Sequence, residues 1–137
     1  MKVVIDTNVL LVSISTFSKY HWLFQSIIKG ELELGVANEI LSEYAEKLYE
    51  KLGEATATNT LRTLLELQNV VQIVPYFPFQ LITADPDDNK FADCAFAHNA
   101  DFLITNDKHF NILKTIDFPK INVVRIEEFE EFLKQTR

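Results

Sequence analysis

The stretch KVVIDTNVLLVSI, residues 2–14, decides the fold. It opens with the apolar, β-branched run Lys2-Val3-Val4-Ile5, which is typical of a buried strand. Asp6 follows this run directly, and residues 8–14 have the apolar spacing of a short helix. The stretch therefore predicts a strand–helix unit with a carboxylate at the carboxyl end of its strand.

The same pattern recurs along the chain. Apolar runs rich in β-branched residues lie at 2–5, 33–36, 70–74, 102–105 and 123–126. Segments with helical spacing lie between and after them, at 20–29, 38–52, 56–68, 86–99 and 127–135. Short apolar strands that alternate with helices are typical of a parallel sheet covered on both faces. The sequence therefore predicts one α/β domain over residues 1–137, built as a three-layer α/β/α sandwich.

Polar residues and prolines suggest where the elements begin and end. Asn38 can cap the helix 38–52, and Asp85 can cap a helix that has Pro86 at its first position. We expect the helices on either side of Gly53 to form a hairpin. The stretch PYFPFQLITA, residues 75–84, has no clear period and is expected to cross the sheet as a loop.

The composition fits one globular domain inside a cell. A chain of 137 residues, 47% of them hydrophobic, is long enough to bury a single core. The single Cys94 excludes an internal disulfide framework, and we expect it to be a small buried helix residue. Asp6 and Asn8 interrupt the apolar run that a signal peptide needs, and no stretch is long enough to span a membrane. We expect a soluble, cytoplasmic protein.

The formal charge of −7 argues against simple nucleic-acid binding, because phosphate contacts normally require a basic surface. Two explanations of the acidity remain open. The acids either keep the surface soluble or gather around bound cations, which would then attract phosphate.

Two aspartates follow predicted strands, Asp6 after residues 2–5 and Asp107 after residues 102–105. Ligands of open parallel sheets bind beyond the carboxyl ends of the strands, so both acids could face one crevice if these strands are neighbours. Each acid could instead cap a helix. Thr7 and Asn8 can cap the helix after Asp6, which favours a functional role for Asp6, whereas capping remains open for Asp107.

Further acids lie on two predicted helices. Glu43 shares the helix 38–52 with other glutamates, so a solvated charged face also explains it. Asp85, Asp87 and Asp88 crowd the start of the helix 86–99, where negative charge interacts favourably with the helix dipole. These acids exceed what a cap requires, and a cation would relieve their mutual repulsion. Capping and metal binding both remain open for Asp88.

The available ligands indicate a hard cation. Mg²⁺ prefers oxygen ligands, whereas the three His and one Cys of this chain show no zinc spacing. Carboxylate-bound ions can activate water for attack on a phosphodiester and stabilise the departing oxygen. The acids therefore suggest phosphodiester hydrolysis.

The same residues resemble the PIN-domain nucleases, and within them the VapC-like toxin components of toxin–antitoxin pairs. The resemblance covers nearly the whole chain and rests on the motifs VVIDTNVL (3–10), ILSEY (40–44) and DPDDNKFADCAFAHNADFLITND (85–107). It implies a five-stranded parallel sheet in the order 3-2-1-4-5, which places the strands before Asp6 and Asp107 side by side.

The resemblance also implies the residues of the site. It places the catalytic, metal-binding carboxylates at Asp6, Glu43, Asp88 and Asp107, with Mg²⁺ or Mn²⁺ as the cofactor. Asn8 and Thr105 match polar positions that steady the site, and Asp87 and Asp93 are alternatives for the third acid. Lys90, Lys108 and His109 flank the acids, where they either contact RNA phosphates or are solvated side chains.

The implied function is hydrolysis of single-stranded or looped RNA, whose backbone is exposed to a base-independent attack. The implied partners are a cognate antitoxin protein and a second copy of the chain. A catalytically inactive PIN scaffold that binds RNA or protein is the alternative. A phosphoacceptor receiver domain does not fit, because Asp6 stands alone where that class has an acidic pair. A haloacid-dehalogenase phosphatase lacks its D-x-D motif, and nucleotide-binding folds lack their Gly-rich loop.

Overall fold

The computed structural model of the protein describes residues 1–136 and contains one five-stranded sheet. All neighbouring strands are parallel, in the order β3-β2-β1-β4-β5. The strands are β1 (Lys2–Ile5), β2 (Glu33–Val36), β3 (Val70–Gln72), β4 (Phe102–Ile104) and β5 (Val123–Val124). The predicted α/β fold and its strand order 3-2-1-4-5 are therefore confirmed.

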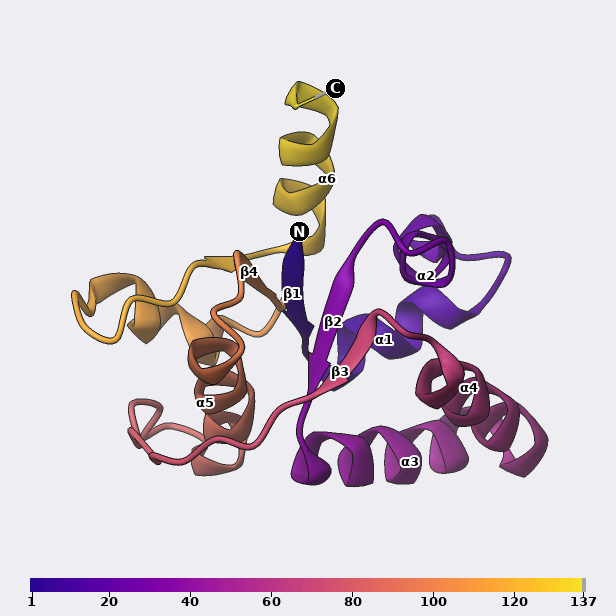
Figure 1. The fold of residues 1–137 in the computed structure, drawn as a ribbon, viewed down its shortest axis with the longest axis horizontal. Helices are drawn as coiled ribbons and strands as arrows, with labels where there is room; N and C mark the ends of the chain where they lie inside the picture. Colours follow the sequence, from indigo (N-terminus) through magenta and orange to yellow (C-terminus); the bar gives the residue numbers. More distant parts are fainter. Residues whose placement is uncertain (137) are drawn as a thin grey trace.

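Helices cover both sides of this sheet (Figure 1). They are α1 (Thr7–Ile14), α2 (His21–Ile28), α3 (Asn38–Leu52), α4 (Glu54–Glu66), α5 (Asn89–Ala97) and α6 (Ile126–Gln135). Two 3₁₀ helices, η1 (Pro86–Asp88) and η2 (Lys108–Thr115), precede α5 and follow β4. α5 lies on one side of the sheet and α1 to α4 on the other, which gives the predicted three layers.

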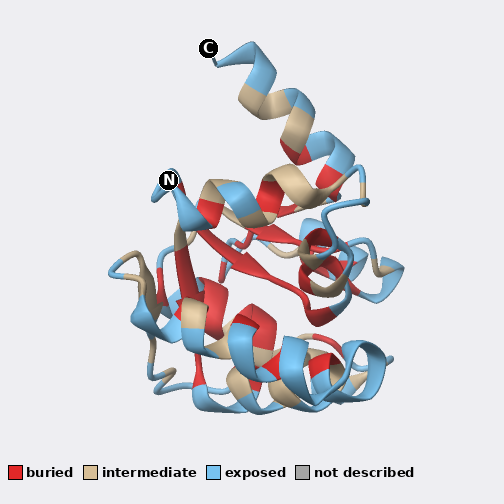
Figure 2. Ribbon diagram, turned by 90° about the vertical axis from the view of Figure 1, so that its right-hand side faces the viewer, coloured by how far each residue is buried: buried red, intermediate tan, exposed pale blue. Residues whose placement is uncertain are grey.

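The core lies where the central strands meet these helices (Figure 2). Val3, Val4 and Ile5 of β1 are fully buried, as the apolar run at the start of the chain predicts. Cys94 of α5 is also fully buried, so the prediction of a buried helix cysteine is confirmed. No helix among residues 1–136 has the length and apolar character needed to cross a membrane.

Some element boundaries differ from those predicted. Asn38 is the first residue of α3 and makes no side-chain cap bond, so its predicted role as the cap is wrong; Ala37 occupies the cap position. The predicted helix 86–99 is divided into η1 and α5. η2 was not predicted; it is held by the buried side chains of Phe110 and Leu113, which lie three residues apart.

The chain between β3 and η1 is a loop, as predicted for residues 75–84. It leads from the β3 edge of the sheet to the side on which α5 lies (Figure 1). β3 ends at Gln72, earlier than predicted, and Pro75, which has no N–H to donate to a neighbouring strand, follows soon after. Residues 75–84 therefore do not pair with the sheet and instead lie near α5.

Two glycines have positions that require them. Gly53 joins α3 to α4 at φ 87°, a left-handed conformation that glycine adopts without steric cost, and the predicted hairpin forms there. At Gly35 a Cβ atom would lie 2.6 Å from Cδ2 of His98, which packs against β2. The missing side chain thus lets α5 approach the sheet closely.

Candidate active site

The carboxyl ends of β1 and β4 lie side by side at one end of the sheet, which we call its carboxyl edge. Ile5 and Ile104 are register partners, and the amide of Asp6 donates to the carbonyl of Ile104 at 3.0 Å. The Thr105 hydroxyl donates to Oδ2 of Asp6 at 2.8 Å and accepts from the amide of Asp107 at 3.0 Å. Thr105 therefore links the two strand-borne aspartates directly.

Asp6 is a buried carboxyl group at this edge. Its residue is only 6% exposed, and burial raises the pKa of the carboxyl to about 6, against the opposing effect of the Thr105 hydrogen bond. The negative charges of Glu43 and Asp107 raise the pKa further. Asp6 stands at the N-cap position of α1 but makes no side-chain cap bond, so capping does not explain it.

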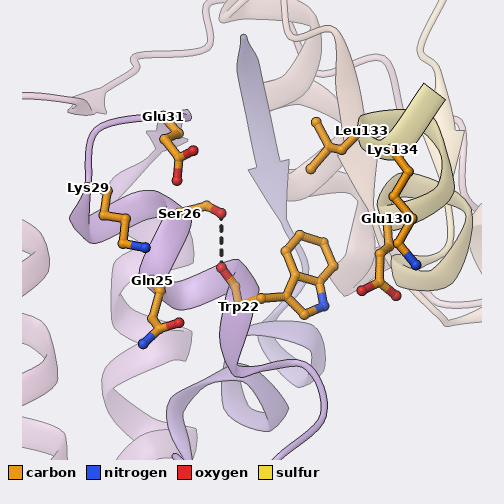
Figure 3. A pocket seen from close by; sticks show the side chains of 8 residues that line it. All are labelled: Trp22, Gln25, Ser26, Lys29, Glu31, Glu130, Leu133 and Lys134. Carbon is orange, nitrogen blue, oxygen red and sulfur yellow. Dashed lines mark hydrogen bonds between the residues drawn. The ribbon is translucent and has the colours of Figure 1, made fainter. Parts of the chain in front are cut away.

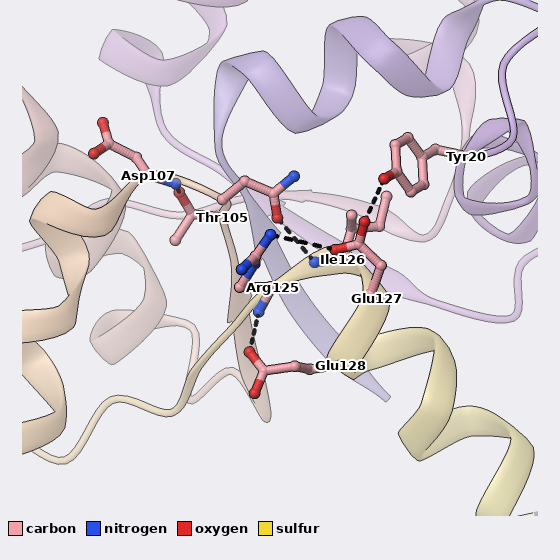
Figure 4. Close-up of polar contacts among 8 residues, drawn as sticks. Tyr20, Thr105, Asp107, Arg125, Ile126, Glu127 and Glu128 are labelled. Atoms are coloured by element: carbon pink, nitrogen blue, oxygen red, sulfur yellow. Dashed lines mark hydrogen bonds and ion pairs between the residues drawn. The ribbon is translucent and has the colours of Figure 1, made fainter.

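Asp107 does act as a cap. Its Oδ1 accepts from the amide of His109 at 2.9 Å and so holds the first turn of η2 (Figure 4 shows Asp107 beside Thr105). The next element is tied to the same edge, because the side chain of Asn106 accepts from the amide of Ile126 at the start of α6 at 3.2 Å. The remaining oxygen of Asp107 makes no hydrogen bond within residues 1–136 and is available to a ligand.

Glu43 reaches the same edge from α3. Its Oε2 accepts from the hydroxyl of Thr7, and its Oε1 lies 2.8 Å from the ammonium of Lys90. The side chain is only 19% exposed, so the explanation of Glu43 as part of a solvated helix face is wrong. The buried hydroxyl of Tyr44 donates to the carbonyl of Ile5, which fixes α3 against the end of β1.

Asp88 lies in the 3₁₀ turn before α5, opposite these groups. Its Oδ2 is buried and has no hydrogen-bond partner within residues 1–136. Burial raises the pKa of this carboxyl to about 7, and the charges of Asp85, Asp6, Asp107 and Glu43 raise it further. An orphaned, buried carboxylate oxygen among four other acids calls for a cation.

The two alternatives to Asp88 point elsewhere. Asp87 is exposed and pairs with Lys90 at 2.9 Å, and hydrogen bonding to that lysine lowers the pKa of Asp87. Asp93 accepts from the amide of Phe79 at 3.2 Å and lies beside the loop before α5. Neither carboxyl shares the charge interactions that couple Asp88 to both Asp6 and Asp107.

One group of possible metal ligands includes two residues that were not predicted as members of the metal-binding quartet, Asp85 and His109. Ligand atoms of Asp85, Asp88 and His109 all lie within 4.8 Å of one another. Asp6, Glu43 and Asp107 lie outside this group, although their charges act on Asp88. Asp85 was expected to cap a helix within a cluster of acids, but it makes no side-chain cap bond. The absence of that bond is visible only in the structure.

The other predicted residues have different settings. Asn8 lines a hollow of about 290 Å³ together with Asp6, Asn106 and Asp107. Lys90 has only 10% of its side chain exposed, and its ammonium pairs with two carboxylates, Glu43 and Asp87. Lys108 and His109 are exposed beside Asp107, where the His109 ring lies 3.5 Å from its carboxylate. Thr7 was missed, because the sequence suggested only a capping role for it.

Another hollow of about 260 Å³ lies between α2 and α6 (Figure 3). Trp22 and Leu133 contribute apolar surface, and the charged lining residues are two lysines and two glutamates. No cluster of three potential metal ligands lies there among residues 1–136. The metal-binding potential of the molecule is therefore concentrated at the carboxyl edge of the sheet.

The fold and this edge define a class of protein: three-layer α/β/α domains that gather carboxylates where parallel strands β1 and β4 end. The PIN domain family model matches residues 2–109, most of the chain. The protein therefore belongs to the PIN domain family, whose members are nucleases.

Comparison with solved structures supports this fold. The protein is similar to a chain in the crystal structure of VapBC2 from Rickettsia felis bound to a DNA fragment from their promoter. The TM-score is 0.64 at 16% sequence identity, and the match covers 91% of this chain and 98% of that one. No curated protein sequence matches the chain.

Proposed function

We propose that the protein is a Mg²⁺- or Mn²⁺-dependent endoribonuclease. The observation that carries this proposal is the orphaned, buried oxygen of Asp88 within a group of mutually repelling carboxylates. Oxygen ligands with surplus negative charge suit a hard divalent cation. A cation bound there would supply an activated water and stabilise charge on the departing oxygen of a phosphodiester.

In this proposal Asp6, Glu43, Asp88 and Asp107 form the catalytic and metal-binding group. Asp6, Asp88 and Asp107 each offer an oxygen toward the cation, with Asp6 oriented by the Thr105 hydroxyl. Glu43 differs, because both of its oxygens are engaged by Lys90 and Thr7. It therefore contributes charge and positions its neighbours more than it offers a free oxygen. Asp85 and His109 are further possible ligands next to Asp88.

We propose single-stranded or looped RNA as the substrate, and the charge of the site supports this proposal. A phosphate needs positive charge to approach a protein of net charge −7, and a cation on this edge would provide it locally. The exposed Lys108 and His109 flank Asp107 and are proposed phosphate contacts, whereas the ammonium of Lys90 is already paired with two carboxylates. Single-stranded or looped RNA exposes its backbone to such a site without unwinding.

We further propose that the protein is the toxin of a toxin–antitoxin pair. The similarity to a chain of the VapBC2 structure over nearly all of both chains supports this proposal. A cognate antitoxin protein would then bind the chain. We also propose that two copies of the chain form a homodimer. Co-expression with the product of a neighbouring reading frame tests for the antitoxin, which should co-purify and suppress RNA cleavage.

The test of the nuclease is a cleavage assay on fluorescently labelled RNA with Mg²⁺, with Mn²⁺ and with EDTA. We expect cleavage with the metals, none with EDTA, and a loss of at least roughly 100-fold in Asp6→Asn, which keeps the size of the side chain but removes its charge. Equal cleavage by Asp6→Asn would disprove the mechanism. RNA binding without cleavage across varied RNAs and both metals would instead support the inactive scaffold.

A further inference from the structure

A pocket of about 310 Å³ adjoins the carboxylate group. Its walls are the first turn of α3, the loop after β3 and the outer side of Lys90, whose ammonium contacts Glu43 at 2.8 Å. The volume lies at the lower end of the range of small-molecule pockets, roughly 300–1,000 Å³. We infer that this pocket binds one unpaired base of the RNA, with guanine preferred, beside the phosphodiester that is cleaved. The inference rests on the proposed function.

One wall of the pocket is apolar and open. Phe77 and Val74 line it and are 64% and 65% exposed. The ring of Phe77 packs edge-to-face on Phe79 at 4.8 Å between centroids, and Phe79 packs in the same way on Phe96 of α5. Phe77 is therefore held in place with much of its surface uncovered, as a stacking partner for a base requires.

The lining also contains polar groups that could be used in recognition. Asp93 accepts from the amide of Phe79 through Oδ1, and its second oxygen makes no hydrogen bond within residues 1–136. Glu39 lines the pocket, is exposed and has no ion pair among the same residues. Asn38 adds an amide, whose Oδ1 is 3.5 Å from Nε2 of Gln72. The pocket thus offers two carboxylates and one amide donor.

The charge of these walls argues against a phosphate and for a neutral base. Lys90, the cation of the lining, is already paired with Glu43 and Asp87. Glu39 and Asp93 then leave the pocket negatively charged. A phosphate would be repelled, whereas a heterocycle with N–H donors would be attracted.

Guanine matches this arrangement best among the four bases. Its Watson–Crick edge has two adjacent donors, N1–H and the N2 amino group, next to the acceptor O6. Carboxylates accept from such donors, and the amide of Asn38 can donate to an acceptor. Adenine and cytosine offer one amino donor on this edge, and uracil offers one N–H between two acceptors. Unstacked bases of single-stranded RNA leave this edge free to be read.

The test compares cleavage of short polyuridine RNAs that contain a single guanosine, inosine or adenosine. Inosine lacks only the N2 amino group of guanosine. We expect kcat/KM to fall by roughly 10-fold from guanosine to inosine, as for loss of one hydrogen bond to a charged acceptor. Glu39→Gln should reduce this preference, and Phe77→Ala should lower kcat/KM on the guanosine RNA by roughly 10-fold through lost stacking.

Matched controls come from the same elements. Glu46 of α3 and Tyr76 of the loop are exposed and lie outside the pocket, so Glu46→Gln and Tyr76→Ala should retain the guanosine preference of the unaltered protein. Active protein that cleaves the guanosine and inosine RNAs equally would overturn the inference and leave the nuclease intact. Absence of cleavage of every RNA would overturn the nuclease, and this inference with it.

Discussion

The acids carried by strands and the acids at the start of α5 reach the same edge in different ways. Asp6 is buried at the end of β1 and accepts a hydrogen bond from Thr105 at the end of β4. Asp87 and Asp88 lie in a 3₁₀ turn, where one pairs with a lysine and the other has an oxygen without a partner. Strand pairing fixes the position of the first group of acids. In the second group, the geometry of the turn determines which aspartate pairs with a lysine and which has a free oxygen.

The two groups of acids are positioned by different features of the fold. Parallel pairing of β1 and β4 forces residues after both strands to be neighbours. The turn of η1 instead gives adjacent aspartates different surroundings: Asp87 is exposed and pairs with Lys90, whereas Asp88 has a buried oxygen without a partner within residues 1–136. In the proposed function, one residue of register in that turn therefore decides which aspartate can bind the cation.

The largest expected effect comes from changing each of these two neighbours in turn. Asp88→Asn should lower RNA cleavage by roughly 100-fold or more, because it removes the acid with the orphaned oxygen. Asp87→Asn should change cleavage by less than about 3-fold, because exposed ion pairs contribute little. Titration with Mn²⁺, followed by electron paramagnetic resonance, should show weaker metal binding only for Asp88→Asn.

The two variants share a turn, so circular dichroism of both serves as the control for folding. Strong loss of activity in Asp87→Asn with little effect of Asp88→Asn would reverse the assignment of the third acid. Equal effects would show that the turn does not separate the roles of its aspartates.

The strand-borne half of the site could be predicted from the sequence. The apolar runs before Asp6 and near Asp107 indicate strands, and a resemblance in sequence supplies the strand order that makes them neighbours. Thr105 also lies on a strand end, so its position beside Asp6 follows from the register of β1 and β4. An apolar run extends over several residues, so it is recognised despite errors of a residue or two at element ends.

The helix-borne half could not be predicted from pattern alone. Glu43 has the sequence setting of a solvated glutamate, and only the packing of α3 against β1 places it on Thr7 and Lys90. Asp85 and Asp88 depend on where a turn becomes an α-helix, and sequence patterns locate such boundaries least well. Lys90 was expected either to contact RNA phosphates or to be solvated, but two neighbouring carboxylates hold its ammonium.

A smaller effect is expected at Thr105, the residue that joins the strand-borne acids. Thr105→Val keeps the shape of this buried side chain but removes the donor to Asp6 and the acceptor of the Asp107 amide. Cleavage should fall by roughly 10-fold, as for other groups that orient a metal ligand. Unfolding in urea should show a loss of about 1–3 kcal/mol from the unpaired groups. Thr105→Ser retains the hydroxyl and should keep most of the activity; equal losses in both variants would argue against the hydrogen bonds as the cause.

The smallest effect is a change of stability with pH in the metal-free protein. The pKa values of Asp6 and Asp88 are raised from the ordinary 3.8 to about 6 and about 7, so folding favours their protonated forms. This stability is fully present below pH 3.8 and is lost as the pH rises through about 7. Asp87 and Glu127 have lowered pKa values, and their contributions no longer change between pH 5 and 8. The melting temperature should therefore fall across this range.

Asp6→Asn separates this contribution of the strand-borne acid from the rest. The amide cannot ionise but can still accept from Thr105, so the variant should melt higher than the unaltered protein at pH 8, by about half as much at pH 5, and nearly the same below about pH 3.8. The gain at pH 8 is at most about 3 kcal/mol, the equivalent of the shift at Asp6. Asp117→Asn, at an exposed position before β5, should leave the pH dependence unchanged.

Mn²⁺ should raise the melting temperature of the unaltered protein at pH 8 far more than at pH 5, because the cation competes with protons for the same oxygens. A pH dependence that is identical in Asp6→Asn would show that burial at the end of β1 does not control the ionisation of this acid.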